Sequence, residues 1–207
     1  MSYPLPLLDP KFNISIETIT RETFHRVYWA GQDPLKPSVA GNNRYDCPGH
    51  LPSKDRFGVL YMGYDLTTCW METVVRHNMI RPAGLNMMIP LARMENRWAC
   101  EISSPEPLVL AQFADESLVD LGDCASNIMD DSYIRTQVWS LLFHSHKNPV
   151  VDGIRYRSRF NSGQFCIALF GRAAIRKKLS AAYMQSLNPA ISLAAQSILK
   201  RYGVVPC

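Results

Sequence analysis

The order of strand-like and helix-like segments is the feature that most constrains the fold of this chain. Strand patterns occur at residues 23–29, 58–62, 85–91, 97–103, 107–110, 153–157 and 164–170. Helical patterns occur at residues 65–77, 132–143 and 189–202. Helices therefore do not follow strands in regular alternation, as a doubly wound parallel sheet requires. We expect an α+β fold, with a mixed, mainly antiparallel sheet and flanking helices.

Size and composition indicate one compact unit, with a mild positive charge that fits a small anionic ligand as well as a nucleic acid. The chain has 207 residues, 47% of them hydrophobic, which suits a single domain. Its 22 Lys and Arg against 18 Asp and Glu give a net charge of +4, well below the basicity of most nucleic-acid binders. Six widely separated cysteines form no CxxC pair, so we expect neither a metal site nor disulfides, and a reducing compartment.

The beginning of the sequence bears on localisation. Residues 1–10 contain three prolines and no basic segment followed by an apolar stretch, so they do not have the pattern of a cleavable secretion signal. No run of about 18 apolar residues occurs that could cross a membrane. We expect a cytoplasmic protein without membrane contact, and export by a route that needs no signal stays open.

Four segments carry residues suited to chemistry. In residues 23–29 the strand alternation places Arg26 on the same face as Phe24 and Tyr28. Arg44 lies in a long polar loop, and Glu72 lies on a helix capped by Asp65, away from its apolar stripe. The segments are Phe24-His25-Arg26-Val27-Tyr28, Asn43-Arg44-Tyr45-Asp46, Leu60-Tyr61 followed by Glu72, and Gly153-Ile154-Arg155-Tyr156-Arg157-Ser158. Each alone has an ordinary structural explanation, because such polar side chains are usually exposed.

Taken in this order, the four segments resemble the RES domain, named for an Arg, a Glu and a Ser, over residues 23–170. The resemblance implies a fold similar to that of ADP-ribosyltransferase toxins, with a core at about 23–170 and a C-terminal helical extension at 171–207. It also implies a toxin that degrades NAD with water or phosphate as acceptor, and an antitoxin or immunity protein as partner. NAD would be the substrate, and no cofactor is implied.

The resemblance also assigns roles to residues. It makes Arg26 or Arg44 the family's arginine, Glu72 its glutamate and Ser158 its serine, with Tyr61 as an accessory. The sequence departs from the family at Tyr45-Asp46, where members tend to have Trp-Asn, and by placing Val27 between Arg26 and Tyr28.

These residue types suit the cleavage of NAD. Planar Arg side chains such as Arg26 and Arg44 can bind a pyrophosphate through paired hydrogen bonds. Arg157, on its extended segment, could also bind phosphate. A carboxylate, here Glu72, stabilises an oxocarbenium-like sugar, as in glycosidases. The departing nicotinamide is neutral and needs a stacking ring more than an acid, which we assign first to Tyr61 and then to Tyr28.

Ser158 and the histidines are interpreted as orienting or structural residues. No histidine near Ser158 in sequence suggests an activated nucleophile, so Ser158 would orient the ribose or phosphate. His25 and His77 lie on predicted apolar faces, and His144 and His146 end a helix, where an imidazolium complements the dipole.

Two other functions stay open. An ADP-ribosyltransferase would hold NAD in the same way, although such enzymes often have two acidic residues close together, and here Asp65 is the nearest acid before Glu72. A nucleic-acid-binding module would use residues 155–159 and 172–178, with aromatic rings stacked on bases. The sequence does not decide between water and phosphate as acceptor, nor between a monomer and a homo-oligomer.

Overall fold

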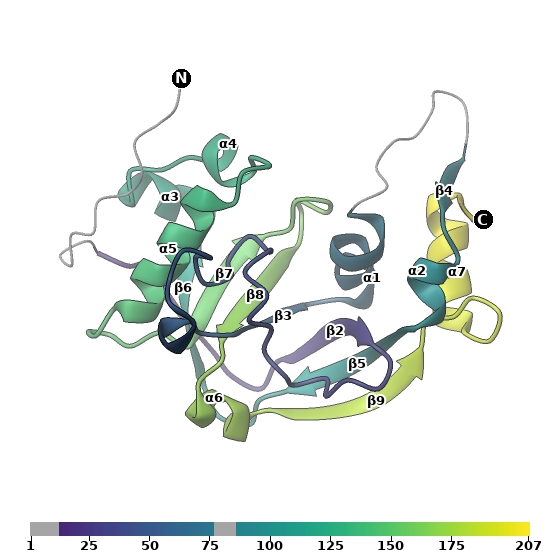
Figure 1. Cartoon of the computed structure of the whole chain (residues 1–207), viewed down its shortest axis with the longest axis horizontal. Helices are drawn as coiled ribbons and strands as arrows, with labels where there is room; N and C mark the ends of the chain where they lie inside the picture. The colour runs from purple at the N-terminus through teal and green to yellow at the C-terminus, as the bar shows by residue number, and fades with distance from the viewer. Residues whose placement is uncertain (1–12, 77–85) are drawn as a thin grey trace.

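The computed structural model describes residues 13–76 and 86–207, and its centre is an eight-stranded sheet (Figure 1). Its strands are β1 (Ile16–Ile19), β2 (Thr23–Trp29), β3 (Val59–Gly63), β5 (Arg97–Ser103), β6 (Leu108–Phe113), β7 (Gly153–Arg157), β8 (Phe165–Phe170) and β9 (Ser180–Ser186). They lie in the order β1-β6-β7-β8-β3-β2-β5-β9. The β6–β7 pair is parallel and the other neighbours are antiparallel. The expected α+β fold with a mixed, mainly antiparallel sheet is confirmed.

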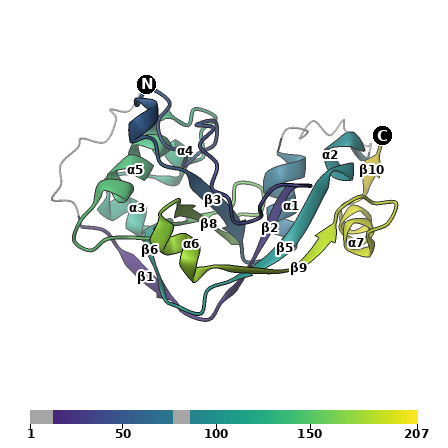
Figure 2. The same ribbon diagram turned by 60° about the horizontal axis from the view of Figure 1, so that its bottom comes forward.

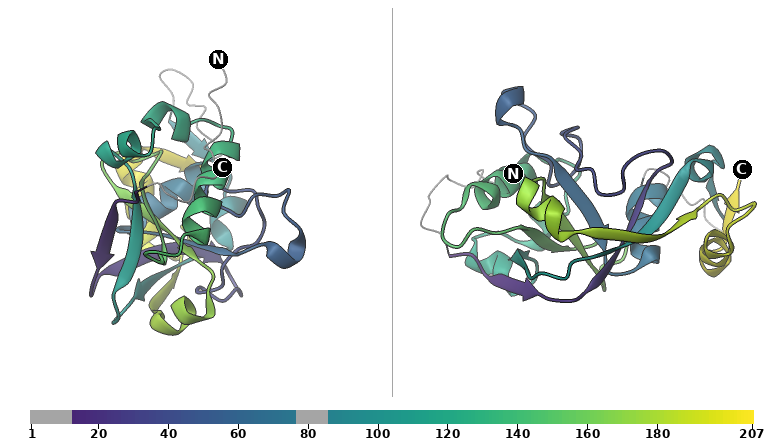
Figure 3. Two further views of the ribbon diagram at one scale, coloured as in Figure 1. Left: turned by 90° about the vertical axis from the view of Figure 1, so that its left-hand side faces the viewer. Right: turned by 90° about the horizontal axis from the view of Figure 1, so that it is seen from below.

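The two longest of the described helices lie near opposite ends of this sheet. Figure 3, in the view from below, shows the long helix α5 (Ile134–Ser145) near one end and α7 (Leu193–Tyr202) at the other. α1 (Leu66–Trp70) continues directly into the π-helix η2 (Met71–Val75). The short helices are η1 (Ser53–Asp55), α2 (Ala92–Glu95), α3 (Glu116–Asp120), α4 (Ala125–Ile128) and α6 (Ala173–Lys178). A small parallel pair joins β4 (Met87–Ile89) to β10 (Val204–Pro206).

Three apolar clusters hold the layers together. The first lies between α5 and the sheet and contains Phe113, Trp139 and Phe143 in mutual ring contact. The second lies on the other face of the sheet, next to α6, and the third joins α1 and η2 to α7. Because burying apolar surface is the main source of stability, these clusters fix where α1 and η2 lie relative to β2.

The predicted element boundaries agree closely with the structure at several points. β2, β5 and β7 have the expected bounds, and the Asp65 carboxylate accepts a hydrogen bond of 2.7 Å from Thr68 N at the start of α1. Gly203 ends α7 with a left-handed φ of 60°, directly after residue 202, where the sequence pattern places the end of this helix. His77 lies outside the described residues.

The start of the last helix was predicted wrongly. Its cap is Ser192, whose Oγ accepts a hydrogen bond of 3.2 Å from Ala195 N, so the helix begins at Leu193 and not at residue 189. The Asn188 side chain instead accepts from Ala190 N at 2.9 Å and stabilises a turn that contains Pro189. Ile191, which lies within the range predicted to be helical, precedes this cap and is 76% exposed.

The two edge strands of the sheet were not expected. β1 has four residues, and β9 is exposed along most of its length, so neither shows the alternation that marks a half-buried strand. Figure 2 shows β1 and β9 at opposite edges of the bent sheet. β9 extends the sheet past residue 170, where the sequence places the end of the core. In the described residues, no helix is long and apolar enough to cross a membrane.

Candidate active site

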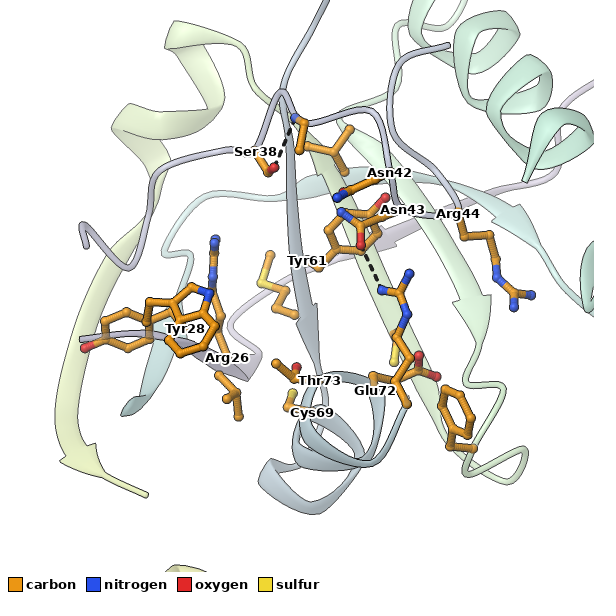
Figure 4. Close-up of a pocket in the computed structure, with 18 of the residues that line it drawn as sticks. Arg26, Tyr28, Ser38, Asn42, Asn43, Arg44, Tyr61, Cys69, Glu72 and Thr73 are labelled. Atoms are coloured by element: carbon orange, nitrogen blue, oxygen red, sulfur yellow. Dashed lines mark hydrogen bonds between the residues drawn. The ribbon is translucent and has the colours of Figure 1, made fainter. Parts of the chain in front are cut away.

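A cavity lies where the sheet splits between β2 and β3. These strands pair only at His25 and Gly63, and they diverge beyond this point. The diverging parts, residues 26–29 of β2 and Val59, Tyr61 and Met62 of β3, line a cavity of about 470 Å³ (Figure 4). This volume is in the range of small-molecule sites. The split therefore opens the sheet to a ligand without disturbing the packed clusters on either side.

Glu72 and Ser158 are in direct contact. The Ser158 hydroxyl donates a hydrogen bond of 2.6 Å to Glu72 Oε1, and Arg159 N donates a second, of 2.8 Å, to the same oxygen. Ser158 is fully buried, and its Oγ also accepts from Phe160 N at 3.3 Å and Asn161 N at 3.1 Å. Among the described residues no group donates to Glu72 Oε2, which leaves that oxygen available to a ligand.

Ser158 lies behind Glu72, outside the cavity lining. The expectation that its hydroxyl faces the ribose or phosphate therefore needs a correction. Its hydroxyl proton is used by the carboxylate, and its lone pairs accept the backbone N–H groups of the turn that follows β7. Ser158 is still interpreted as an orienting residue, but the group that it orients is the Glu72 carboxylate.

The π-helix explains how Glu72 reaches this position. α1 begins at the Asp65 cap, whose Oδ2 accepts a hydrogen bond of 2.7 Å from Thr68 Oγ1. Thr68 Oγ1 in turn accepts from Asn161 Nδ2 at 2.9 Å, so the turn after β7 is tied to the first turn of α1. From Met71 the helix widens to π geometry, which changes the direction of the side chains that follow; such segments are frequent at functional sites.

Arg26 enters the cavity with unused hydrogen-bonding capacity. Its Nη2 donates to Lys36 O at 3.3 Å, whereas the buried Nη1 has no partner among the described residues. Burial lowers the pKa of Arg26 to about 10, so the side chain stays charged at neutral pH. A buried, unpaired donor on a charged group is costly, and an anionic ligand would satisfy it.

Arg44 and Arg76 have partners of their own. Arg44 Nη1 donates to Ile128 O, and Figure 4 shows its side chain pointing away from Arg26. Arg76, which the sequence analysis did not single out, donates to Asn43 Oδ1 at 2.8 Å and to Tyr133 OH at 3.1 Å. Arg76 follows Glu72 by four residues, a helical spacing that could have indicated it.

Tyr61 is held in place through its hydroxyl. It donates to Asp46 Oδ1 at 2.9 Å and accepts from Tyr45 N at 3.0 Å. The buried Asp46 also accepts two hydrogen bonds from Asn43, which fixes the loop against β3. Burial and the Asp46 charge raise the pKa of Tyr61 well above its usual value. The neutral Tyr61 can thus offer its ring, but not a proton, and the departure at Tyr45-Asp46 has a structural role.

The structure brings together most of the residues selected from the sequence. Those that line the cavity are Arg26, Tyr28, Arg44, Tyr61 and Glu72. Arg157 is placed elsewhere, where its Nη2 forms an ion pair of 2.9 Å with Asp115 and its guanidinium lies 3.9 Å from the centre of the Phe165 ring. Its position on a strand face opposite to that of Tyr156 directs it away from the cavity.

The cavity lining is strongly positive. Among the described residues it contains one carboxylate, Glu72, and six arginines, four of which the sequence analysis did not assign to the site. The six are Arg26, Arg44, Arg76, Arg93, Arg97 and Arg159. Arg159 is neutralised by Asp131 at 2.6 Å, but the remaining charge is suited to a ligand with several negative charges.

Comparison with known proteins identifies the family. The sequence profile of the RES domain matches residues 19–187, which is most of the chain and includes all strands of the main sheet except β1, of which only the last residue is matched. The chain belongs to the RES domain family. No curated protein matches this RES-domain chain at a significant level.

A solved structure supports the fold. The chain is similar to the MbcT toxin in the crystal structure of the M. tuberculosis MbcT–MbcA toxin–antitoxin complex, with a TM-score of 0.63 and 17% sequence identity. The match covers 87% of this RES-domain chain and 91% of the other. At this level of identity the likeness establishes a shared fold.

Proposed function

We propose that this RES-domain protein degrades NAD by cleaving the bond between nicotinamide and ribose, with water or phosphate as acceptor. The observation that carries the proposal is the Glu72 carboxylate, fixed by the buried Ser158 in a cationic cavity that also holds Arg26, whose buried Nη1 has no partner among the described residues. The charge of the cavity matches a pyrophosphate, and its single carboxylate matches a developing positive charge on a sugar.

The cleavage step needs little acid or base chemistry. When the bond from C1′ to the nicotinamide nitrogen breaks, the electron pair leaves with the ring, which becomes neutral, and C1′ acquires oxocarbenium character. Glu72 Oε2 would stabilise that charge, directly or through the ribose hydroxyls. An acceptor oxygen then bonds to C1′ and releases its proton. The neutral Tyr61 ring, and after it Tyr28, would hold the nicotinamide by stacking.

The arginines would bind the pyrophosphate. Arg26 is the first candidate, because its Nη1 lacks a partner among the described residues and its planar fork fits phosphate oxygens. Arg44 and Arg76 lie on the other side of the cavity, where their existing hydrogen bonds fix them near Tyr133. Arg157, which pairs with Asp115, would stabilise the fold and would not bind NAD.

We further propose that the protein is a toxin that acts in the cytoplasm and is neutralised by a cognate antitoxin or immunity protein. The MbcT–MbcA complex, a toxin with its antitoxin, supports this view through the shared fold. Expression without a partner should stop growth and deplete cellular NAD, and the Glu72→Gln variant should do neither. Growth arrest with an unchanged NAD content would contradict the proposal.

A further inference from the structure

The end of the cavity farthest from Ser158 carries a second group of arginines. Arg97, the first residue of β5, lies with its guanidinium carbon 3.5 Å from the centre of the Trp29 ring. Its buried Nε has no hydrogen-bond partner among the described residues. Burial lowers the pKa of Arg97 to about 10, and the positive charge of Arg93, which lines the same cavity, contributes to this shift. In residues 13–76 and 86–207 neither arginine forms an ion pair.

These arginines are distant from the carboxylate that would act on the sugar. Ser158, the partner of Glu72, directly follows β7, and Arg97 begins β5. Between these two strands lie β8, β3 and β2. In a continuous sheet four strand spacings amount to roughly 19 Å, and the divergence of β2 from β3 beyond His25 and Gly63 widens this separation. A dinucleotide with its nicotinamide end at Glu72 would therefore extend its adenosine end toward Trp29 and Arg97.

The positive charge of the cavity lining exceeds the negative charge of the NAD pyrophosphate. Six arginines and one glutamate give a formal charge of +5, which Asp131 reduces to +4 through its pair with Arg159. The pyrophosphate of NAD supplies two negative charges. A phosphate monoester adds nearly two more and offers three acceptor oxygens, which suits two arginines that have no carboxylate partner in the described part of the chain.

We propose that Arg93, Arg97 and Trp29 form a subsite for a phosphate monoester on the adenosine end of the dinucleotide, so that the enzyme accepts the 2′-phosphorylated form, NADP. Trp29 is 42% exposed with Arg97 over its ring, which leaves indole surface to contact the adenine. Arginines near the ribose are a recurrent solution for the 2′-phosphate. The subsite rests on the proposed function only for the orientation of the ligand.

Binding to the intact chain tests the subsite without turnover. Calorimetry would compare adenosine 2′,5′-bisphosphate, 5′-AMP and inorganic phosphate. We expect the bisphosphate to bind roughly tenfold to hundredfold more tightly than 5′-AMP, the range for hydrogen bonds to a charged group. Arg97→Gln and Arg93→Gln should remove this difference. Arg201→Gln, an exposed arginine on α7, is the matched control and should keep it.

The outcomes separate the subsite from the cleavage reaction. Equal affinity for the bisphosphate and 5′-AMP would overturn the subsite, even if NAD is cleaved. Binding of inorganic phosphate that depends on Arg97, without preference for the bisphosphate, would overturn it in favour of a free-phosphate site. Preference for the bisphosphate without cleavage of either dinucleotide would uphold the subsite and contradict the proposed function. If the protein has both the subsite and the cleavage activity, the ratio of kcat/KM for NADP to that for NAD should fall in Arg97→Gln.

Discussion

The Ser158 hydroxyl donates a hydrogen bond of 2.6 Å to Glu72 Oε1, across 86 residues of sequence. This bond joins the end of β7 to the π-helix η2, and Arg159 N strengthens it with a second donor to the same oxygen. The carboxylate is thereby fixed before any ligand arrives. Pre-organised charge of this kind stabilises a transition state more effectively than a mobile side chain, because no reorganisation is needed during the reaction.

Glu72→Gln should abolish most turnover of NAD and leave the fold intact. The amide oxygen can still accept from Ser158 and Arg159, but the negative charge is lost. Removing one electrostatic stabiliser costs about 10² to 10³ in kcat. Steady-state kinetics and a thermal melt would check both parts. A folded Glu72→Gln variant with the activity of the parent would remove Glu72 from the reaction.

Ser158→Ala should reduce both stability and activity, because Ser158 positions Glu72. The substitution leaves the Phe160 and Asn161 N–H groups without their acceptor, at a cost of about 1 to 3 kcal/mol each if they stay buried. We expect measurable residual turnover with a lowered kcat. Denaturant unfolding and kinetics test this. Complete inactivity in a stable Ser158→Ala variant, together with a covalent intermediate in the parent, would instead indicate a nucleophile.

Arg26→Lys should weaken NAD binding more than Arg44→Lys. Lysine keeps the charge but loses the planar fork, and at Arg26 this should raise the dissociation constant roughly tenfold to hundredfold. Arg44 already donates to Ile128 O, so a smaller rise is expected there. Calorimetric titration with NAD of each lysine variant combined with Glu72→Gln separates binding from cleavage. The opposite order of effects would make Arg44 the family's arginine.

Acid should destabilise the protein through His144. Its ring stacks on Phe57 at 4.0 Å, and burial, aided by Arg172 and Lys147, lowers the pKa to about 4 from 6.5, so the expected imidazolium at the helix end is not supported. Between pH 4 and 6.5 the unfolded chain binds a proton at His144 more readily than the folded chain does. The stabilisation of the fold by the neutral His144 is therefore complete above pH 6.5 and is lost as the pH falls toward 4. His144→Phe should flatten the melting temperature between these pH values; an unchanged profile would contradict this.

The sequence predicted those parts of the fold and site that depend on local pattern. Alternation located β2, β5 and β7, and the Asp65 cap located the helix with Glu72. Resemblance, and not periodicity, associated Glu72 with Ser158. The π-helix, the Asp46 anchor of Tyr61 and the split between β2 and β3 depend on contacts between distant segments. Such contacts leave no periodic signal, and β9 lacks one because most of its residues are exposed.

The most direct test of the central claim is to incubate the purified chain with NAD, with and without phosphate, and to resolve the products. We predict release of nicotinamide together with free ADP-ribose when water is the acceptor, or ADP-ribose-1″-phosphate when phosphate is. The Glu72→Gln variant should release neither. Transfer of labelled ADP-ribose to a macromolecule would indicate a transferase, and NAD that stays intact, in a folded protein freed of any bound partner, would contradict the account.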